Sequence, residues 1–311
     1  MLMKIIGSAA GGGFPQWNCN FRLSRAARAG EPGLRPRTQS SLAVSADGAR
    51  WVLFNASPDI RQQIAATPAL QPGPDAPLRS SPLCAVVLTN ADVDHVAGLL
   101  SLRERQPFAL YATAEILGIL AENPIFNVLD PAIVSRRELI PGGAIEIADA
   151  EGRGTGVGIE PFVVAGKEPL YLEEAAPSEA RPHHEGETIG IRILPSDGGK
   201  SFFYIPACAT ITDDLRRRLE GAAGALFDGT FYTNDEMIVA GVGKKTAARM
   251  GHSPLSGAEG TLARLTGIAI GRRILVHINN TNPILDGDSP QRRAVEAAGW
   301  EVAWDGMEVA F

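Results

Sequence analysis

Cysteine is scarce in this 311-residue chain, which contains only Cys19, Cys84 and Cys208. An odd number of widely separated cysteines does not form the disulfide framework that stabilises small secreted domains. The chain therefore suits a reducing compartment, and its 45% hydrophobic content is enough to bury a large core. Cys84 and Cys208 fall in apolar, strand-like segments, so we expect them to pack in that core rather than bind a metal.

Long apolar runs are also missing from the sequence. The first residues are mostly apolar, but Gly7, Ser8 and the glycines at 11–13 follow directly. This start is too short for the apolar core of a signal peptide or for a membrane span. We therefore expect a cytoplasmic protein that does not insert into a membrane.

Clusters of positive charge are nearly absent, and the formal net charge is −6. One run of three arginines, at 216–218, stands beside Asp213, Asp214 and Glu220 in a helix-like segment. Nucleic-acid binding normally needs a basic patch, and arginines mixed with acidic residues are typical of a solvated helix face. We therefore expect no nucleic-acid partner.

The chain divides into two β-rich halves, in which short apolar strands are followed by helix-like segments. This plan indicates an α/β fold of two sheets with outer helices, an αββα sandwich, and we expect a single domain over 1–311. The range around 141–187 is rich in Gly, Pro, Ala and Glu and is predicted to be an irregular insertion. Strands are predicted at 4–6, 41–45, 51–54, 84–88, 108–112, 159–164, 189–194, 202–205, 225–227 and 274–276, and helices at 96–103, 114–121 and 212–220.

The loop after the predicted strand at 84–88 contains an unusual density of polar side chains. Asn90, Asp92, Asp94 and His95 lie within it. Carboxylates and an imidazole so close together are costly to desolvate unless a cation compensates their charge. Loops at strand ends are also where a scaffold presents functional groups, so this spacing predicts a metal site.

Three further metal-capable residues stand near later strands and helices. Asp228 and His277 directly follow strands, and His252 precedes a helix-like segment. Each alone has a structural explanation, since an Asp after a strand is commonly a helix cap and a loop His commonly a hydrogen-bonding residue. Asn279 and Asn280 follow His277 closely, and they are candidates either to orient that histidine or to bind a substrate backbone.

The polar loop resembles the metal-binding motif of the metallo-β-lactamase superfamily. That superfamily has His-x-His-x-Asp-His, whereas this chain has Asn90-x-Asp92-x-Asp94-His95, so only the last Asp-His pair is kept. His277 matches the last histidine of the superfamily. The resemblance implies the αββα metallo-β-lactamase fold with a reduced metal site.

Two early segments, at 7–15 and 53–59, resemble the phosphodiesterase and RNase Z branch of the superfamily. Most of that branch has an Asp where Asn55 stands in this chain. The strand that ends at 204–206 also lacks the metal-bridging Asp expected close by. The resemblance therefore implies that the ligands for a second metal are missing.

The ligands that remain by this resemblance are Asp94, His95 and His277. Two imidazoles and one carboxylate with open positions form the facial triad of non-haem Fe(II) oxygenases, but zinc also uses such a set in some hydrolases. The ligand set therefore favours Fe(II) only modestly, with Zn(II) as a substitute. Three further residues are candidates for catalytic partners or alternative ligands: Asp92, Asp228 and His252.

Longer strings resemble one family nearly throughout the chain, apart from its middle. This family is PqqB, which takes part in the biosynthesis of pyrroloquinoline quinone (PQQ). Strings of this length are far more specific than a metal motif alone. They lie at 8–19 (SAAGGGFPQWNC), 37–41 (RTQSS), 55–61 (NASPDIR), 98–104 (GLLSLRE), 228–230 (DGT) and 277–283 (HINNTNP).

The resemblance implies an iron- and O2-dependent hydroxylase that works beside other PQQ-pathway enzymes. Its substrate would be a Glu-Tyr dipeptide, cut from the PQQ precursor peptide and cross-linked between its two side chains, and oxygen would be added to the tyrosine ring. Substrate carboxylates need cationic partners, and Arg37, Arg61 and Arg103 are candidates because arginine binds carboxylates in a bidentate manner. Two alternatives remain, a zinc-dependent hydrolase and a non-catalytic PQQ carrier or transport protein.

Two other sets of potential ligands are expected to form no metal site. Many members of the PqqB family have further cysteines just after the position of Cys19, which together hold a structural zinc, but here the residues at 20–22 are NFR. A single cysteine cannot complete such a site. His183 and His184 lie in the Pro- and Glu-rich middle of the chain, where a solvated loop is expected.

Overall fold

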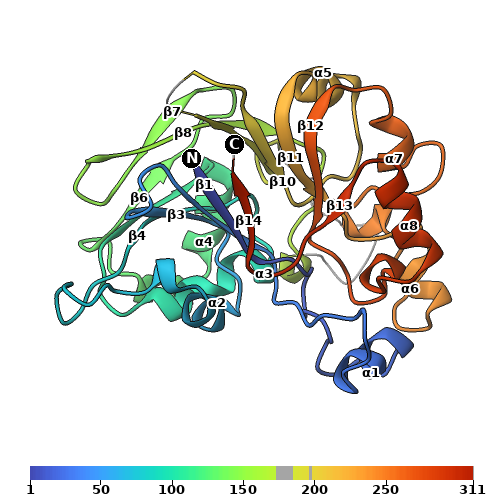
Figure 1. Cartoon of the computed structure of the whole chain (residues 1–311). Coiled ribbons are helices and arrows are strands. Elements are labelled where there is room, and N and C mark those ends of the chain that lie inside the picture. Colours follow the sequence, from blue (N-terminus) through green and yellow to red (C-terminus); the bar gives the residue numbers. More distant parts are fainter. Residues whose placement is uncertain (173–184, 196–197, 311) are drawn as a thin grey trace.

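Two β-sheets of seven strands each form the centre of the described chain, and helices cover the outer faces of both sheets (Figure 1). The computed structural model describes residues 1–172, 185–195 and 198–310. This arrangement is the αββα sandwich that the sequence predicts. Among the described helices, none is long and apolar enough to cross a lipid bilayer.

The first sheet mixes antiparallel and parallel strands. In spatial order, its strands are β14 (Met307–Ala310), β1 (Leu2–Gly7), β2 (Ser41–Ser45), β3 (Trp51–Phe54), β4 (Leu83–Val87), β5 (Phe108–Ala112) and β6 (Val134–Glu138). The strands from β3 to β6 are parallel neighbours, and parallel pairs need a crossover connection outside the sheet. Their carboxyl ends lie at one edge, so the polar residues that follow β4 are brought to that edge.

The second sheet repeats this plan. In spatial order, its strands are β13 (Glu301–Val302), β12 (Ile270–Val276), β11 (Ala222–Asp228), β10 (Phe202–Ile205), β9 (Ile189–Leu194), β8 (Gly154–Val163) and β7 (Ile145–Ala148). The strands from β10 to β13 are parallel neighbours, and those from β7 to β10 are antiparallel. Asp228, the last residue of β11, is in register with Val276, which places it beside the segment that begins with His277.

Short helices connect the strands and cover the sheets. Ile116 of α4 packs in one buried cluster with Leu110 of the first sheet, and Val295 of α8 packs with Leu275 of the second. The α-helices are α1 (Arg22–Arg28), α2 (Ile60–Ala66), α3 (Val93–Val96), α4 (Ala114–Glu122), α5 (Asp213–Leu219), α6 (Glu236–Val239), α7 (Thr261–Arg264) and α8 (Pro290–Ala297). The 3-10 helices are η1 (Pro68–Leu70), η2 (Ala97–Leu102), η3 (Pro124–Val128), η4 (Leu170–Leu172), η5 (Ala248–Met250) and η6 (Pro283–Leu285).

A dense apolar core fills the space between the two sheets. Phe54 of β3 and Tyr204 of β10 contact each other edge to face, with ring centroids 6.1 Å apart, and both side chains are buried. Each large apolar side chain removed from water contributes roughly 1.5–3 kcal/mol to stability. Cys84 lies in this core and Cys208 in the core outside the second sheet, as the sequence predicts.

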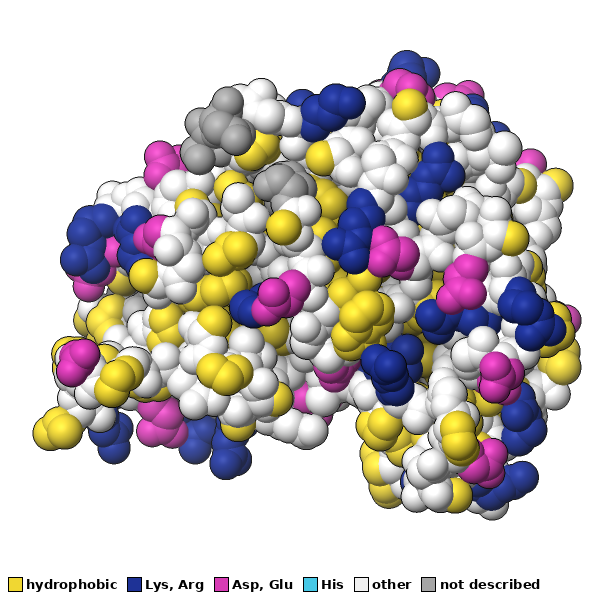
Figure 2. Space-filling view, in the orientation of Figure 1, with side chains coloured by type: hydrophobic (Ala, Val, Ile, Leu, Met, Phe, Trp, Pro, Cys, Tyr) yellow, Lys and Arg dark blue, Asp and Glu magenta, His cyan; other side chains and the backbone are white. Residues whose placement is uncertain are grey.

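Charges of both signs are interspersed on the surface. On the face shown in Figure 2, Lys and Arg side chains lie among Asp and Glu side chains rather than gathering in one patch. The arginine run lies on α5, where Arg216 pairs with Asp213 at 3.4 Å and Arg218 with Asp214 at 2.9 Å. Pairs of this spacing form on a solvated helix face, as the sequence predicts for this run.

The middle of the chain is more regular than the sequence suggested. The range 141–187 was expected to be an irregular insertion with one strand near 159–164, but β7 and β8 pair within it, β7 as an edge strand of the second sheet and β8 as its neighbour. Over 154–159, β8 alternates glycines with buried side chains, and the low strand propensity of glycine hid this period of two. Residues 173–184, which include His183 and His184, lie outside the described part of the chain.

The segment after β4 also differs from expectation. Asp94 and His95 were expected in a loop, but they lie in the single helical turn of α3. The helix expected at 96–103 is the 3-10 helix η2. Gly98 lets this segment lie against the backbone after β3, because a Cβ atom there would be 2.1 Å from the carbonyl oxygen of Ser57. Asp94 and His95 are therefore held by a helical turn.

Candidate metal centre

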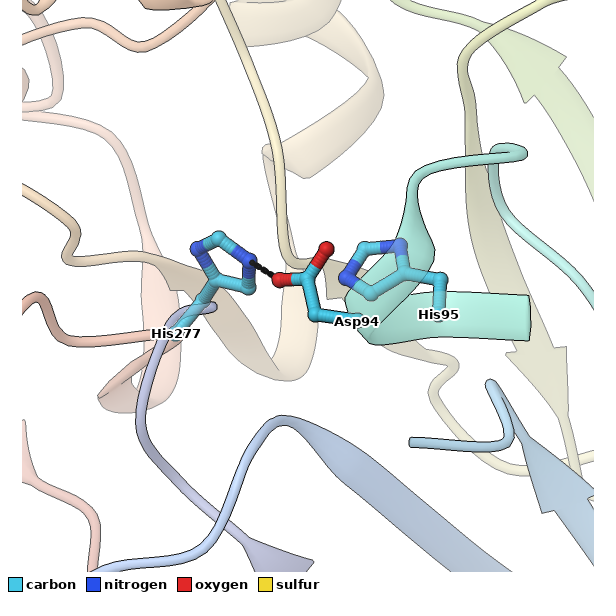
Figure 3. Close-up of side chains that lie close together, drawn as sticks. All are labelled: Asp94, His95 and His277. Atoms are coloured by element: carbon cyan, nitrogen blue, oxygen red, sulfur yellow. Dashed lines mark hydrogen bonds and ion pairs between the residues drawn. The ribbon is translucent and has the colours of Figure 1, made fainter. Parts of the chain in front are cut away.

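Two strand ends bring the potential ligands together, one from each sheet (Figure 3). Asp94 and His95 stand on α3 after β4 of the first sheet, and His277 directly follows β12 of the second. The Oδ2 atom of Asp94 lies 3.0 Å from Nε2 of His277. Ligand atoms from all three residues lie within 4.8 Å of one another, so the side chains can converge on one ion.

These residues fit a metal ion, because one buried ring nitrogen has no partner in the described part of the chain. His95 is 1% exposed, and its Nε2 has no hydrogen-bond partner among the described residues. In Figure 3 a nitrogen of this ring points toward Asp94. A buried polar atom without a partner costs about 1–3 kcal/mol, and an ion bound between the three side chains would satisfy it.

The electrostatics of the site favour the protonation states that a metal requires at His95 and Asp94, whereas they favour a proton on His277. Burial lowers the pKa of His95 to about 4, so its imidazole is neutral at neutral pH. Burial acts to raise the pKa of Asp94, but the adjacent His95 and His277 outweigh it and hold that pKa below its usual range. Burial acts to lower the pKa of His277, whereas the hydrogen bond and charge of Asp94 raise it. A metal ion would displace the proton from His277.

Two threonine hydroxyls contact the far side of the histidine rings. Thr230 Oγ1 lies 2.8 Å from Nδ1 of His277, and Thr89 Oγ1 lies 3.5 Å from Nδ1 of His95. Thr89 is itself fixed by Asn55, whose Oδ1 accepts a hydrogen bond from the Thr89 backbone N–H at 2.9 Å. Such outer contacts orient each ring and leave its Nε2 for the metal.

Two residues at the candidate metal site have strained backbone conformations. Asn55 and His277 adopt left-handed conformations, with φ of 62° and 56°. Conformations of this kind cost of the order of 1–3 kcal/mol and persist where surrounding contacts enforce them, typically at functional sites. Here Asn55 N donates to Val87 O at 2.9 Å, and the carbonyl of His277 accepts from Thr230 Oγ1 at 2.8 Å.

Asp228 and His252 form a second group beside His277. The Nδ1 atom of His252 lies 2.7 Å from Oδ2 of Asp228, and the ring of His252 stacks on that of His277 with centroids 5.2 Å apart. The buried Asp228 also accepts hydrogen bonds from the backbone N–H groups of Cys208 and Thr230, both at 3.0 Å. Burial acts to raise the pKa of Asp228, but the charge of His252 outweighs it. This geometry favours a positioning role for Asp228, because protein donors already occupy its oxygens.

Asp92 faces a lysine rather than the three converging side chains. Lys167 Nζ lies 3.3 Å from Asp92 Oδ1. Two sets of potential metal ligands converge among the described residues, Asp94 with His95 and His277 and Asp228 with His252 and His277, and Asp92 belongs to neither. Lys167 was not identified from the sequence, because one lysine in a Gly- and Pro-rich range forms no recognisable pattern. The ammonium group of Lys167 thus compensates the charge of the Asp92 carboxylate.

A cavity of about 510 Å³ opens onto the site, and Asp94, His252 and His277 all line it. This volume lies within the range of small-molecule sites. Asn279 lines the cavity as well. Three lysines that the sequence analysis did not single out also line it: Lys167, Lys244 and Lys245.

The three arginines expected to bind substrate carboxylates lie elsewhere. Arg37 is buried and donates to the carbonyl of Ala303 at 3.2 Å. Arg61 is exposed on α2, and the exposed Arg103 donates to the carbonyl of Leu100 at 2.8 Å. None of these three arginines is among the described residues that line the cavity. Residue type alone does not reveal which face of the fold a side chain reaches.

Asn280, the remaining candidate, connects the N-terminal segment to the site. Asn280 does not line the cavity. Its Nδ2 donates to the side chain of Gln16, and its Oδ1 lies 3.5 Å from Sγ of Cys19. Cys19 Sγ also accepts a hydrogen bond from the backbone N–H of Phe21 at 3.4 Å. Asn280 therefore holds the N-terminal segment against the metal-ligand loop.

Sequence matches to known relatives extend over the whole chain. The family model of the β-lactamase superfamily domain matches residues 50–278. A coenzyme PQQ synthesis protein B from Methylobacterium sp. (strain 4-46) is 54% identical over 307 residues, which is 99% of each chain. Its counterpart from Xanthomonas campestris pv. campestris is 48% identical over 311 residues, which is 100% of each chain.

Solved structures show the same relationship. The crystal structure of Zn²⁺-bound PqqB from Methylobacterium extorquens matches with a TM-score of 0.93 and 51% identity and covers 100% of both chains. A diphosphatase of the PhnP family matches with a TM-score of 0.69 at 18% identity over 100% of this chain and 96% of its own, which shows a shared fold. The chain belongs to the coenzyme PQQ synthesis protein B family of the metallo-β-lactamase superfamily.

Proposed function

We propose that this chain acts in PQQ biosynthesis as an iron- and O2-dependent hydroxylase. Its substrate would be the tyrosine ring of a cross-linked Glu-Tyr dipeptide derived from the precursor peptide. The main support is the buried Nε2 of His95, which lies beside the Asp94–His277 pair and has no hydrogen-bond partner among the residues that the structure describes. Two imidazoles and one carboxylate are the set that holds non-haem Fe(II) with open positions, and the names of the relatives support the pathway.

The groups around the cavity have distinct roles in this proposal. Asp94, His95 and His277 would hold Fe(II), which supplies the activation of O2 when bound. Asp228 fixes Nδ1 of His252 at 2.7 Å, so Nε2 of His252 is the atom available to accept the phenolic proton of the substrate. Asn279 lines the same cavity and would contact the dipeptide backbone. Other PQQ-pathway enzymes would supply the dipeptide and use the product.

A zinc hydrolase is the second candidate, because the relative from Methylobacterium extorquens was crystallised with Zn²⁺. Two histidines and one carboxylate also occur at catalytic zinc sites, where the metal assists attack on an ester, phosphodiester or peptide bond. A non-catalytic PQQ carrier would not need this ligand set.

One experiment separates these functions. The protein is loaded anaerobically with Fe(II) or Zn(II). Isotopically labelled O2, the cross-linked Glu-Tyr dipeptide and ascorbate, a two-electron donor that allows the second oxygen atom to leave as water, are then added before mass spectrometry. A mass gain in steps of one labelled oxygen, seen with Fe(II) only and lost in His277→Ala, would support the hydroxylase. Cleavage with Zn(II) would support the hydrolase, and an unchanged dipeptide with both metals would argue against both enzymes.

A further inference from the structure

Asn90 lines the cavity that contains the potential metal ligands, although it is only 4% exposed. It lies in the segment between β4 and the helical turn that carries Asp94. Its Oδ1 accepts a hydrogen bond from the backbone N–H of Asp92 at 3.0 Å. This contact fixes the orientation of the amide, because only the oxygen of an amide group accepts hydrogen bonds. The Nδ2 group is therefore the end of the side chain that a ligand can meet.

The N–H groups of the Asn90 amide are left to the cavity. Within the described part of the chain, the bond from Asp92 is the only hydrogen bond of the Asn90 side chain. The Nδ2 atom is also not among the polar atoms that the protein encloses without a partner. A buried donor that stays unsatisfied costs about 1–3 kcal/mol, and an acceptor atom of a bound molecule would satisfy it.

The position of Asn90 carries a metal-binding histidine in the superfamily motif that this loop resembles. The nitrogen of a side-chain amide offers two N–H donors and no lone pair for a metal ion. With its oxygen engaged by Asp92, Asn90 cannot replace that histidine as a ligand. A position that binds a metal in the superfamily thus presents a hydrogen-bond donor in this chain.

A second amide in the same cavity presents the opposite polarity. Nδ2 of Asn279 donates to Thr281 Oγ1 at 2.6 Å, and the Thr281 hydroxyl in turn donates to Glu236 at 2.5 Å. Because the hydroxyl has one proton and gives it to Glu236, it accepts from Asn279, which assigns the amide nitrogen to this contact. The atom of Asn279 that remains for a ligand is Oδ1, an acceptor.

Apolar side chains form another part of the cavity wall. A thioether makes favourable contacts with the edge of an aromatic ring, and aromatic side chains pack against one another edge to face. A ligand that fits this wall and both amides has an aromatic ring, an oxygen atom and an N–H group. The apolar residues of the wall are Val93, Phe231, Met237 and Met250.

We infer that Asn90 donates a hydrogen bond to the phenolic oxygen of the ligand and so selects a hydroxylated ring. The inference rests on the proposed function, because it takes the dipeptide as the ligand. A phenolic oxygen accepts hydrogen bonds and donates its own proton, so Asn90 and Nε2 of His252, which lines the same cavity, can contact it together. When His252 takes the proton, the electron pair stays on the oxygen, and the N–H groups of Asn90 stabilise its negative charge.

A comparison of two ligands tests this contact without turnover. The cross-linked Glu-Tyr dipeptide and its Glu-Phe analogue differ only in the phenolic hydroxyl, and calorimetric titration of the Zn(II)-loaded protein gives the affinity of each. The variants are Asn90→Ala and Asn90→Ser, and the serine keeps an acceptor for the backbone N–H of Asp92. Asn279→Ala is the control within the cavity, and Asn127→Ala is an exposed control outside it. Zinc content is measured for every variant, so loss of the metal site is recognised.

The parent protein should bind the Glu-Tyr dipeptide about 10-fold more tightly than the Glu-Phe analogue. Both Asn90 variants should lose most of this preference, because neither side chain reaches as far as the amide nitrogen. Asn279→Ala should weaken both ligands equally and keep the preference, and Asn127→Ala should match the parent.

Two results would overturn the inference: a preference that is unchanged in both Asn90 variants, or a parent protein that does not prefer the Glu-Tyr dipeptide. The proposed function is tested separately by oxygen incorporation. If the Asn90 variants lose the preference but the Fe(II)-loaded parent adds no oxygen to the dipeptide, the hydroxylase is wrong and the contact with the phenolic oxygen stands.

Discussion

The Nε2 atom of His277 lies 3.0 Å from Oδ2 of Asp94, although the two residues are 183 positions apart in the chain. His277 follows a strand of the second sheet, and Asp94 follows a strand of the first. The pair therefore forms only when both sheets are packed together. An ion bound there stabilises the folded state by linkage, by about 2.7 kcal/mol at a free concentration of 100 times Kd.

Substitution of Asp94 by Asn should lower Zn(II) affinity by at least about 100-fold. Loss of a residue that only hydrogen-bonds to a metal ligand already costs about 10- to 100-fold, and loss of the ligand itself should cost more. A competition titration against a chelator measures the change. Asp92→Asn is the matched control, because the Asp92 carboxylate faces Lys167 at 3.3 Å, and its affinity should stay within about threefold of the parent. Equal losses in the two variants would show that Asp92 is a ligand.

Thr230→Val removes a hydroxyl that contacts Asp228 at 2.6 Å and His277 Nδ1 at 2.8 Å. We expect an unfolding free energy lower by about 1–3 kcal/mol and a metal affinity lower by about 10- to 100-fold. Urea unfolding and chelator competition measure the two effects. Thr261→Val is the control, because the buried Thr261 hydroxyl has no hydrogen-bond partner among the described residues. A metal affinity unchanged in Thr230→Val would refute the orienting role of this hydroxyl.

His252→Gln should separate catalysis from metal binding. The ring of His252 contacts that of His277, but its Nδ1 is held by Asp228 at 2.7 Å. If His252 accepts the phenolic proton, its loss should slow oxygen incorporation by about 100- to 10,000-fold, while iron content stays close to that of the parent. Single-turnover mass spectrometry and metal analysis give both values. Loss of iron in parallel with activity would instead identify His252 as a ligand.

Glu236 should make stability depend on pH. Burial raises the pKa of Glu236 from 4.5 to about 7. A group with a raised pKa binds its proton more tightly in the folded protein, so it stabilises the fold at low pH, and this contribution is lost as the pH rises through about 7. The shift corresponds to roughly 3 kcal/mol.

Glu236→Gln removes this titration, so the variant should lose less unfolding free energy than the parent between about pH 5 and about pH 8. Urea unfolding of the metal-free proteins measures the difference. Glu259→Gln is the control, because the side chain of Glu259 is 88% exposed. Parallel pH profiles for the parent and Glu236→Gln would contradict the prediction.

Much of the fold could be predicted, because strands and helices are indicated by patterns of residues that are close together in the sequence. The strands predicted at 41–45, 51–54 and 108–112 coincide with β2, β3 and β5, since apolar runs of this length between polar segments are typical of buried strands. The strand β7 escaped prediction. The strand β8 was only partly predicted, because Gly154, Gly156 and Gly158 occupy alternate positions in its first half. The pattern was present, but the residue type obscured it.

The sequence alone determined the order of strands and helices and which side chains are able to bind a metal. Tertiary structure decided how those side chains are used: Asp94 meets His277, Asp92 meets Lys167, and Nδ1 of His252 meets Asp228. It also placed the lysines, and not the expected arginines, at the cavity. Local propensity determines secondary structure, whereas these contacts join distant residues and depend on the register and packing of two sheets.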